Sequence, residues 1–209
     1  MGDHGMRIIV YGATRGRGDG IGHSVALALR ERGHDVTALC RDPAKAAEEG
    51  ELDLEALDLY SAKGQSRFKK LIRDVEPDVI WSACGTGVPD PLWSIGDGEI
   101  DQMIEANVRN NVLLCRTCAP SCLDGGPHLI LTGSVAGVLD GVGTALYSGV
   151  KGFLIPFIRG QRAEYRRQGH NPKLSLLLLN AVRTTGLEIV VDAVEFVGRQ
   201  SHSIELLIG

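Results

Sequence analysis

Short apolar segments alternate with longer amphipathic segments along this chain, and the alternation predicts strands and helices in turn. The apolar segments are continuous runs, which is typical of strands that are buried on both faces of a parallel sheet. The predicted strands are 7–11, 35–40, 52–57, 79–82, 128–132, 174–179 and 204–208. The predicted helices are 21–32, 43–49, 61–75, 99–118, 147–167 and 188–197. The pattern therefore predicts an α/β fold with a doubly wound parallel sheet of about seven strands.

Glycine and proline mark several of the predicted helix ends. Gly33 follows the helix at 21–32 as a natural stop, and Asp42 with Pro43 has the form of a helix start. The chain shows no internal repeat, low-complexity segment or linker, so we expect residues 1–209 to form one domain.

Composition narrows the classes of protein to consider. The 209 residues are 44% hydrophobic and 23% charged, with a net charge of −4, as in ordinary globular proteins. Acidic and basic residues are interspersed, so we expect no nucleic-acid partner. The first apolar run, 8–11, is too short for a signal peptide or a membrane span, which predicts a cytoplasmic protein that does not bind membranes. The five cysteines make a disulfide framework unexpected.

A glycine-rich segment, 12–22, joins the first predicted strand to the first predicted helix. Glycines permit tight turns and let the backbone approach a pyrophosphate, and the helix N-terminus offers free N–H groups to the phosphates. The segment therefore indicates a Rossmann-type dinucleotide site. Which glycines contact the pyrophosphate stays open. The residues that we expect to contact the cofactor here are Gly12, Thr14, Arg15, Gly20, Ile21 and Gly22.

The end of the second predicted strand distinguishes the two nicotinamide cofactors. NAD-binding proteins place an acidic residue there for the ribose 2′-hydroxyl, whereas this chain has Arg41. A guanidinium favours a 2′-phosphate, and Arg15 could reach the same group, so NADP(H) is expected ahead of NAD(H). Asp42 is the competing ribose acceptor, although a helix cap also explains it.

Residues after the third and fourth predicted strands complete the expected cofactor site. Asp58 is either an acceptor for the adenine amino group or an ordinary turn residue. Ala83 and Gly85 are small residues where a strand end must pass close to a flat ligand.

Three residues carry candidate chemistry. Ser134 lies just after the fifth predicted strand, at the edge where open α/β sheets bind ligands. Tyr147 and Lys151 are four residues apart, so on a helix they share one face. A neighbouring ammonium favours the phenolate form of a tyrosine, which can then exchange a proton while hydride moves. By itself this spacing is also explained by a packed tyrosine beside a solvated lysine, whereas the set with Ser134 could hold a substrate oxygen and exchange a proton with it.

Taken together, these features resemble the short-chain dehydrogenase/reductase family over nearly the whole chain. The resemblance implies that Tyr147 is the general acid/base, that Ser134 orients the carbonyl, and that Lys151 binds the nicotinamide ribose. It implies that Asn107 anchors a water linked to Lys151, and that Thr184 meets the nicotinamide carboxamide. It also implies a homodimer or homotetramer. The matching residues are the glycine segment, 82–85 in place of the family's Asn-Asn-Ala-Gly, Asn107, Ser134, Tyr147 and Lys151.

The chain also departs from the family pattern. The segment 12–22 is four residues longer than the usual glycine motif, and 180–184 lacks the usual Pro-Gly pair. Few residues separate Thr184 from the last predicted helix, so the usual substrate-covering region is shortened. We therefore expect an open pocket, or one completed by another subunit or by a carrier-bound carbonyl or alcohol substrate.

Other functions fit the residues less well. A non-catalytic, cofactor-binding partner subunit would explain the shortened substrate region, but the Ser134, Tyr147 and Lys151 set favours an enzyme. A sugar-nucleotide epimerase would need a sizeable C-terminal domain. The cysteines at 115, 118 and 122 lack a fourth zinc ligand, so we interpret them as small buried side chains and predict no metal site.

Overall fold

Seven parallel strands form one sheet in the computed structural model, which describes residues 5–14, 20–42, 44, 52–88, 90–139, 141–180 and 187–208. Their order is β3-β2-β1-β4-β5-β6-β7, so the direction of strand addition reverses between β1 and β4. Such a reversal opens a crevice at the carboxyl ends of the strands. The strands are β1 Arg7–Tyr11, β2 Asp35–Cys40, β3 Leu54–Ala56, β4 Val79–Ser82, β5 His128–Ser134, β6 Leu174–Leu179 and β7 Glu205–Ile208.

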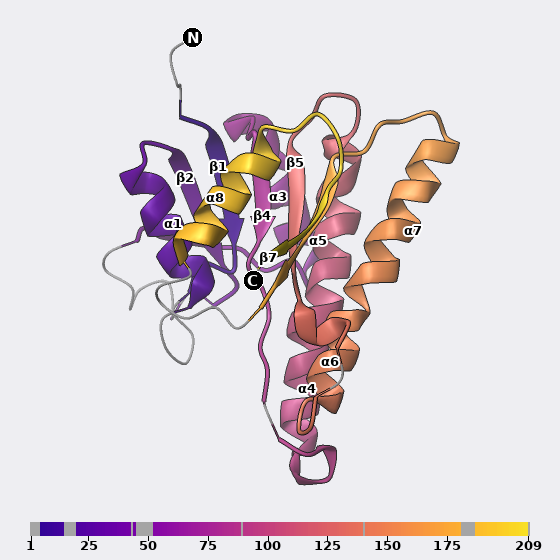
Figure 1. Ribbon diagram of the computed structural model, residues 1–209. Coiled ribbons are helices and arrows are strands. Elements are labelled where there is room, and N and C mark those ends of the chain that lie inside the picture. The colour runs from indigo at the N-terminus through magenta and orange to yellow at the C-terminus, as the bar shows by residue number, and fades with distance from the viewer. Residues whose placement is uncertain are drawn as a thin grey trace.

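Helices cover both faces of this sheet (Figure 1). Short 3₁₀ turns lie at Leu92–Ser94 (η1), Ala119–Cys122 (η3) and Val135–Gly137 (η4), and a π-helical turn lies at Glu105–Arg109 (η2). The α-helices are α1 Ile21–Glu31, α3 Ala62–Val75, α4 Asp97–Ile104, α5 Asn110–Cys118, α6 Ala145–Gly152, α7 Leu154–Arg167 and α8 Leu187–Gly198.

Two hydrophobic cores lie on opposite faces of the sheet. One joins α1 and α8 to strand residues such as Val10, and the other joins α3, α5 and α7 to residues such as Ile9. Successive strand residues point to opposite faces, so each strand must be apolar throughout. This double burial is the reason for the continuous apolar runs in the sequence, and it confirms the predicted doubly wound sheet.

Local signals placed most helix ends correctly. Gly33 has a φ of +84°, and the N–H groups of Gly33 and His34 donate to Arg30 O and Leu29 O, as in a Schellman motif. The Ser61 hydroxyl caps α3 by accepting from the N–H of Gly64. Of the predicted helix 43–49, only Ala44 lies within the described residues.

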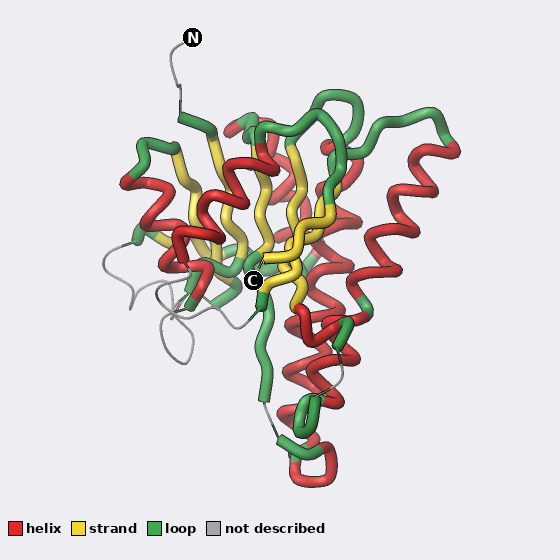
Figure 2. The backbone as a smooth tube through the Cα atoms, viewed as in Figure 1, coloured by secondary structure: helices red, strands yellow, loops and turns green. Residues whose placement is uncertain are grey.

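The two long predicted helices are each interrupted. The helix predicted for 99–118 begins at Asp97 and contains the π-helical turn η2 between α4 and α5. The helix predicted for 147–167 begins at Ala145 and divides at Phe153 into α6 and α7. Pro156 lacks the N–H that would bond to Gly152 O, which explains the break. Figure 2 shows α4 and α6 beyond the carboxyl ends of the strands.

Four of the five cysteines are buried, and Cys84 is partly buried. All five cysteines are free thiols, and Cys115, Cys118 and Cys122 are buried in the core, which confirms their interpretation as packing residues. The described residues contain no cluster of potential metal ligands. Within that part of the chain, no helix has both the length and the hydropathy needed to cross a membrane.

Because the imidazole of His128 is buried, we expect the stability of the protein to depend on pH. The imidazole is fully buried, with Nε2 2.6 Å from Ser175 Oγ, and burial lowers its pKa to about 4. The unfolded chain takes up this proton below about pH 6.5, whereas the folded chain resists it until about pH 4, so stability falls as the pH falls through that window. We expect about 2 kcal/mol to be lost between pH 7 and pH 5 through this group.

Urea unfolding of the wild-type protein and of His128→Gln at both pH values measures this effect. The variant should be less stable at pH 7 but should lose less stability on acidification. Equal losses in the two proteins would contradict the prediction.

Candidate functional site

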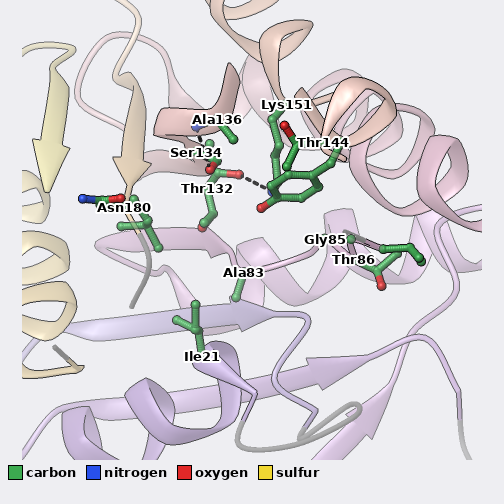
Figure 3. A pocket seen from close by; sticks show the side chains of 15 residues that line it. Ile21, Ala83, Gly85, Thr86, Thr132, Ser134, Ala136, Thr144, Lys151 and Asn180 are labelled. Carbon is green, nitrogen blue, oxygen red and sulfur yellow. Dashed lines mark hydrogen bonds between the residues drawn. The ribbon is translucent and has the colours of Figure 1, made fainter. Parts of the chain in front are cut away.

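A cavity of about 450 Å³ opens at the carboxyl ends of β4 and β5, between the first residue of α1 and the helix α6. Six of the residues predicted from sequence line it, namely Ile21, Ala83, Gly85, Ser134, Tyr147 and Lys151. In Figure 3, Ser134 and Lys151 lie on one side of the cavity, and Ile21 and Ala83 lie on the other. The other lining residues are Thr86, Gly87, Val88, Thr132, Gly133, Ala136, Thr144, Leu179 and Asn180.

Lys151 lies at the buried side of this cavity. Only 4% of the residue is exposed, and its Nζ donates a hydrogen bond of 3.1 Å to the carbonyl oxygen of Thr132 in β5. Removal from water disfavours the ammonium and lowers the pKa of Lys151 to about 8. The Nζ is 5.9 Å from the centroid of the Tyr147 ring one helical turn earlier, so the predicted pair shares a face of α6.

The strand residues beneath Lys151 are held by hydrogen bonds between side chains and backbone. The Thr132 hydroxyl donates to Ser82 O at 2.6 Å and accepts from Trp81 Nε1 at 2.9 Å. The Ser82 hydroxyl donates to Asn111 Oδ1 at 2.8 Å. These bonds join β4, β5 and α5, and they fix the carbonyl that receives the Lys151 ammonium.

Asn107 lies in the π-helical turn η2 and is fully buried. Its Nδ2 donates to Thr86 O at 2.7 Å and to Met103 O at 2.9 Å. Its backbone carbonyl oxygen accepts from Asn111 Nδ2 at 2.8 Å. Its Oδ1 has no hydrogen-bond partner among the described residues. A buried acceptor without a partner is rare, so this oxygen is the atom of Asn107 that can still bind a ligand or a water.

Two glycines after β4 permit the close approach of these groups. A Cβ atom on Gly85 would lie 2.7 Å from both Lys151 Nζ and Asn107 Oδ1. A Cβ atom on Gly87 would lie 2.7 Å from Cδ2 of the Tyr147 ring. The sequence analysis identified Gly85 but missed Gly87, although the Gly-Thr-Gly run at 85–87 is a visible signal.

Ser134 ends β5 and begins the turn η4. Its Oγ accepts a hydrogen bond of 3.2 Å from the N–H of Ala136, which sets the direction of the hydroxyl oxygen. The residue is half-buried and lines the same cavity as Tyr147. A carbonyl oxygen placed there could accept from both.

The glycines at the start of α1 let the helix pack tightly against the sheet. Gly12 has a φ of +94°, and its N–H donates to Leu39 O at 2.9 Å. A Cβ atom on Gly22 would lie 2.3 Å from Gly12 O, so only glycine fits there. Gly20 precedes α1, whose first turn has no side-chain cap. Thr14 ends a described range, and Arg15 lies outside the described residues.

The remaining predicted cofactor residues lie at the ends of β2 and β3. Arg41 is exposed, with its Cζ 5.4 Å from the centroid of the Tyr60 ring. Asp42 Oδ1 accepts from the N–H of Ala44 at 3.0 Å, as the helix-cap interpretation predicts. Asp58 Oδ1 accepts from the N–H of Tyr60 at 3.0 Å, in agreement with the turn alternative. Thr184 lies outside the described residues.

Comparison with known proteins gives a family match. The model of the short chain dehydrogenase family matches residues 7–171. An uncharacterized oxidoreductase of Listeria innocua is 26% identical over 196 residues, which cover 88% of this chain and 77% of that protein. Two solved structures share the fold at 21% identity. Serine dehydrogenase from Escherichia coli has a TM-score of 0.77, with 97% of this chain and 96% of that one covered. A metagenomic short-chain oxidoreductase in complex with NADP has a TM-score of 0.69, with 100% and 99% covered.

The tight packing around Gly85 predicts that alanine there is destabilising. The added methyl group would displace Lys151 Nζ or Asn107, at a cost of about 1–3 kcal/mol in the free energy of unfolding. Gly149 in α6 is a matched control, because an added Cβ meets nothing within 4 Å. Gly149→Ala should stabilise the protein by about 0.5–1 kcal/mol, because alanine favours helix. Urea unfolding compares the two variants, and a Gly85→Ala protein as stable as wild type would contradict the prediction.

Proposed function

The chain belongs to the short chain dehydrogenase family of oxidoreductases, and we propose that it interconverts a carbonyl compound and an alcohol using NADP(H). The observation that supports this proposal most strongly is the meeting of three groups at one cavity. Ser134 and Tyr147 line it, and the buried Nζ of Lys151 lies 5.9 Å from the centroid of the Tyr147 ring. Hydroxyl groups next to a desolvated cation are suited to moving a proton at a substrate oxygen.

The cavity fits the nicotinamide end of a dinucleotide. Small residues line it at the ends of β4 and β5, and the uncapped start of α1 borders it at Ile21. Gly12 and Gly22 bring the start of α1 close to the ends of β1 and β4, where the free N–H groups of the helix could bind a pyrophosphate. In our proposal Ile21, Ala83 and Gly85 contact the cofactor, and Lys151 Nζ binds the nicotinamide ribose. A nicotinamide bound here would supply the hydride acceptor for oxidation of an alcohol and the hydride donor for reduction of a carbonyl.

Tyr147 moves the proton in both directions. In reduction its hydroxyl donates a proton to the substrate oxygen as the carbon gains a hydride, and in oxidation the phenolate takes that proton back. The ammonium of Lys151 stabilises the phenolate electrostatically. Ser134 donates a hydrogen bond to the same substrate oxygen and holds the carbonyl in place. The substrate is a small molecule or a carrier-bound carbonyl compound.

Lys151 and Asn107 form the route by which the proton of Tyr147 is replaced. The lowered pKa of Lys151, about 8, lets its ammonium give up a proton near neutral pH. Asn107 Oδ1 has no hydrogen-bond partner among the described residues. It lies near the Lys151 ammonium, because the residue next to both groups is a glycine, Gly85. A water held at Oδ1 would connect Lys151 to solvent.

Arg41 supports the choice of NADP(H). It follows β2 at the position where NAD-binding proteins use an acidic residue, and it forms no ion pair with any described residue. Its guanidinium is therefore available to a 2′-phosphate. The dimer or tetramer expected from the family resemblance remains part of the proposal.

Replacing the proposed acid/base tests the function. Tyr147→Phe keeps the ring that packs against Gly87 but removes the hydroxyl, so we expect turnover of a carbonyl substrate to fall by at least about 100-fold. NADPH binding, followed by fluorescence titration, should remain within about three-fold of wild type. Tyr165→Phe in α7, outside the cavity, is the matched control and should keep its activity. Turnover that survives in Tyr147→Phe would overturn the proposed role of Tyr147. A wild-type protein that binds NADPH but turns over no carbonyl substrate would favour a non-catalytic subunit.

Removing the Arg41 guanidinium tests the cofactor preference. Arg41→Ala should weaken NADPH binding by about 10- to 100-fold, because charge-assisted hydrogen bonds to the 2′-phosphate are lost. NADH binding should be nearly unchanged. Arg73→Ala, in the last turn of α3, is the matched control for the loss of one positive charge. Equal weakening of both nucleotides in Arg41→Ala would contradict the proposed contact.

A further inference from the structure

Two arginines approach the ring of Tyr60, which follows β3. Arg41 Cζ lies 5.4 Å from the ring centroid, and Arg109 Cζ, from the turn η2, lies 4.7 Å from it. Both distances are within the range of a cation–π interaction. The ring therefore brings together a residue at the end of β2 and a residue from the turn that contains Asn107.

The two guanidinium groups differ in how their charges are balanced. Arg109 forms an ion pair with Glu105 at 2.6 Å, and this contact raises the pKa of Arg109 and lowers that of Glu105. Arg41 contacts the Tyr60 ring but forms no ion pair with a carboxylate of the described ranges, although its positive charge contributes to the lowered pKa of Glu105. Of the two arginines, Arg41 is thus the one that an incoming anion can bind without breaking an ion pair between described residues.

Tyr60 is itself anchored at both ends. Its N–H donates to Asp58 Oδ1 at 3.0 Å, and its hydroxyl donates to Glu105 O at 3.0 Å. Burial raises the pKa of Tyr60 to about 12, so the hydroxyl stays protonated and keeps this bond at neutral pH. These two hydrogen bonds hold the ring in one place, so an exposed arginine can pack against its face.

We propose that Tyr60 is a positioning residue that holds the Arg41 guanidinium ready for the 2′-phosphate of NADP(H), an inference that rests on the proposed function. A free arginine side chain loses much rotational entropy when it binds a phosphate. A ring that already confines the guanidinium lowers this cost and strengthens binding. Tyr60 therefore increases the preference for 2′-phosphorylated nucleotides without touching the phosphate.

The test uses two adenosine fragments that differ mainly in the 2′-phosphate. Isothermal titration calorimetry on the full-length protein measures the affinities for adenosine 2′,5′-bisphosphate and for 5′-AMP, and the ratio of the two is the readout. Tyr60→Leu removes the aromatic face, Tyr60→Phe keeps it, and Arg109→Gln removes the second arginine. Thermal unfolding of each variant confirms that it is folded.

A positioning role predicts a selective change in the ratio. Tyr60→Leu should lower the preference for the bisphosphate by about two- to five-fold, the usual strength of an exposed cation–π contact, while 5′-AMP binding stays the same. Tyr60→Phe and Arg109→Gln should keep the wild-type ratio within about two-fold. These results would support the inference, because a purely structural role would weaken both fragments equally.

The other outcomes separate the two proposals. If the wild-type protein prefers the bisphosphate and Tyr60→Leu keeps that preference, the role of Tyr60 is overturned and the proposed function stands. If Arg109→Gln loses the preference and Arg41→Gln keeps it, the assignment of Arg41 is wrong. If the wild-type protein binds neither fragment, or both equally well, the NADP(H) proposal and the inference fail together.

Discussion

The burial of the Lys151 ammonium constrains how the surrounding strands and helices pack at the cavity. A lysine side chain with 4% exposure loses its hydration, and its one recorded hydrogen bond is to a strand carbonyl, Thr132 O, at 3.1 Å. Removal from water disfavours the charged form and lowers its pKa to about 8. This unfavourable desolvation occurs where the ends of β4 and β5, the turn η2 and the helix α6 meet. A core lysine with no chemical use would ordinarily be replaced by an apolar residue, so a destabilised ammonium at this point is itself a sign of function.

The close packing of backbone makes this burial possible. Lys151 and Asn107 lie so close to Gly85 that no side chain fits there. The Tyr147 ring likewise leaves no room for a side chain at Gly87. The bond from Asn107 Nδ2 to Thr86 O and the bond from Ser82 Oγ to Asn111 Oδ1 then hold η2 and α5 against the end of β4. The π-helical turn at Glu105–Arg109 places Asn107 with Oδ1 free of any partner among the described residues, in agreement with the frequent occurrence of such turns at functional sites.

The same turn also reaches the opposite end of the proposed cofactor site. Glu105 O accepts from the Tyr60 hydroxyl, and Arg109 lies over the Tyr60 ring. One five-residue turn therefore supports Asn107 beside Lys151 and also supports the ring beside Arg41. The proposed chemistry and the proposed cofactor preference thus depend on a shared scaffold, although the two groups of residues lie at different strand ends.

The sequence by itself determined the strands, the sheet type and the main candidates for chemistry. Continuous apolar runs are required wherever a strand is buried on both faces, and Tyr147 and Lys151 at a spacing of four must share a helix face, so local pattern was sufficient for both. Only the tertiary structure decided how deeply Lys151 is buried, that the helix predicted for 99–118 contains a π-helical turn, and that two arginines approach the Tyr60 ring. These features depend on which distant segments pack together, because burial and long-range partners are properties of the whole fold and leave no periodic signal in the chain.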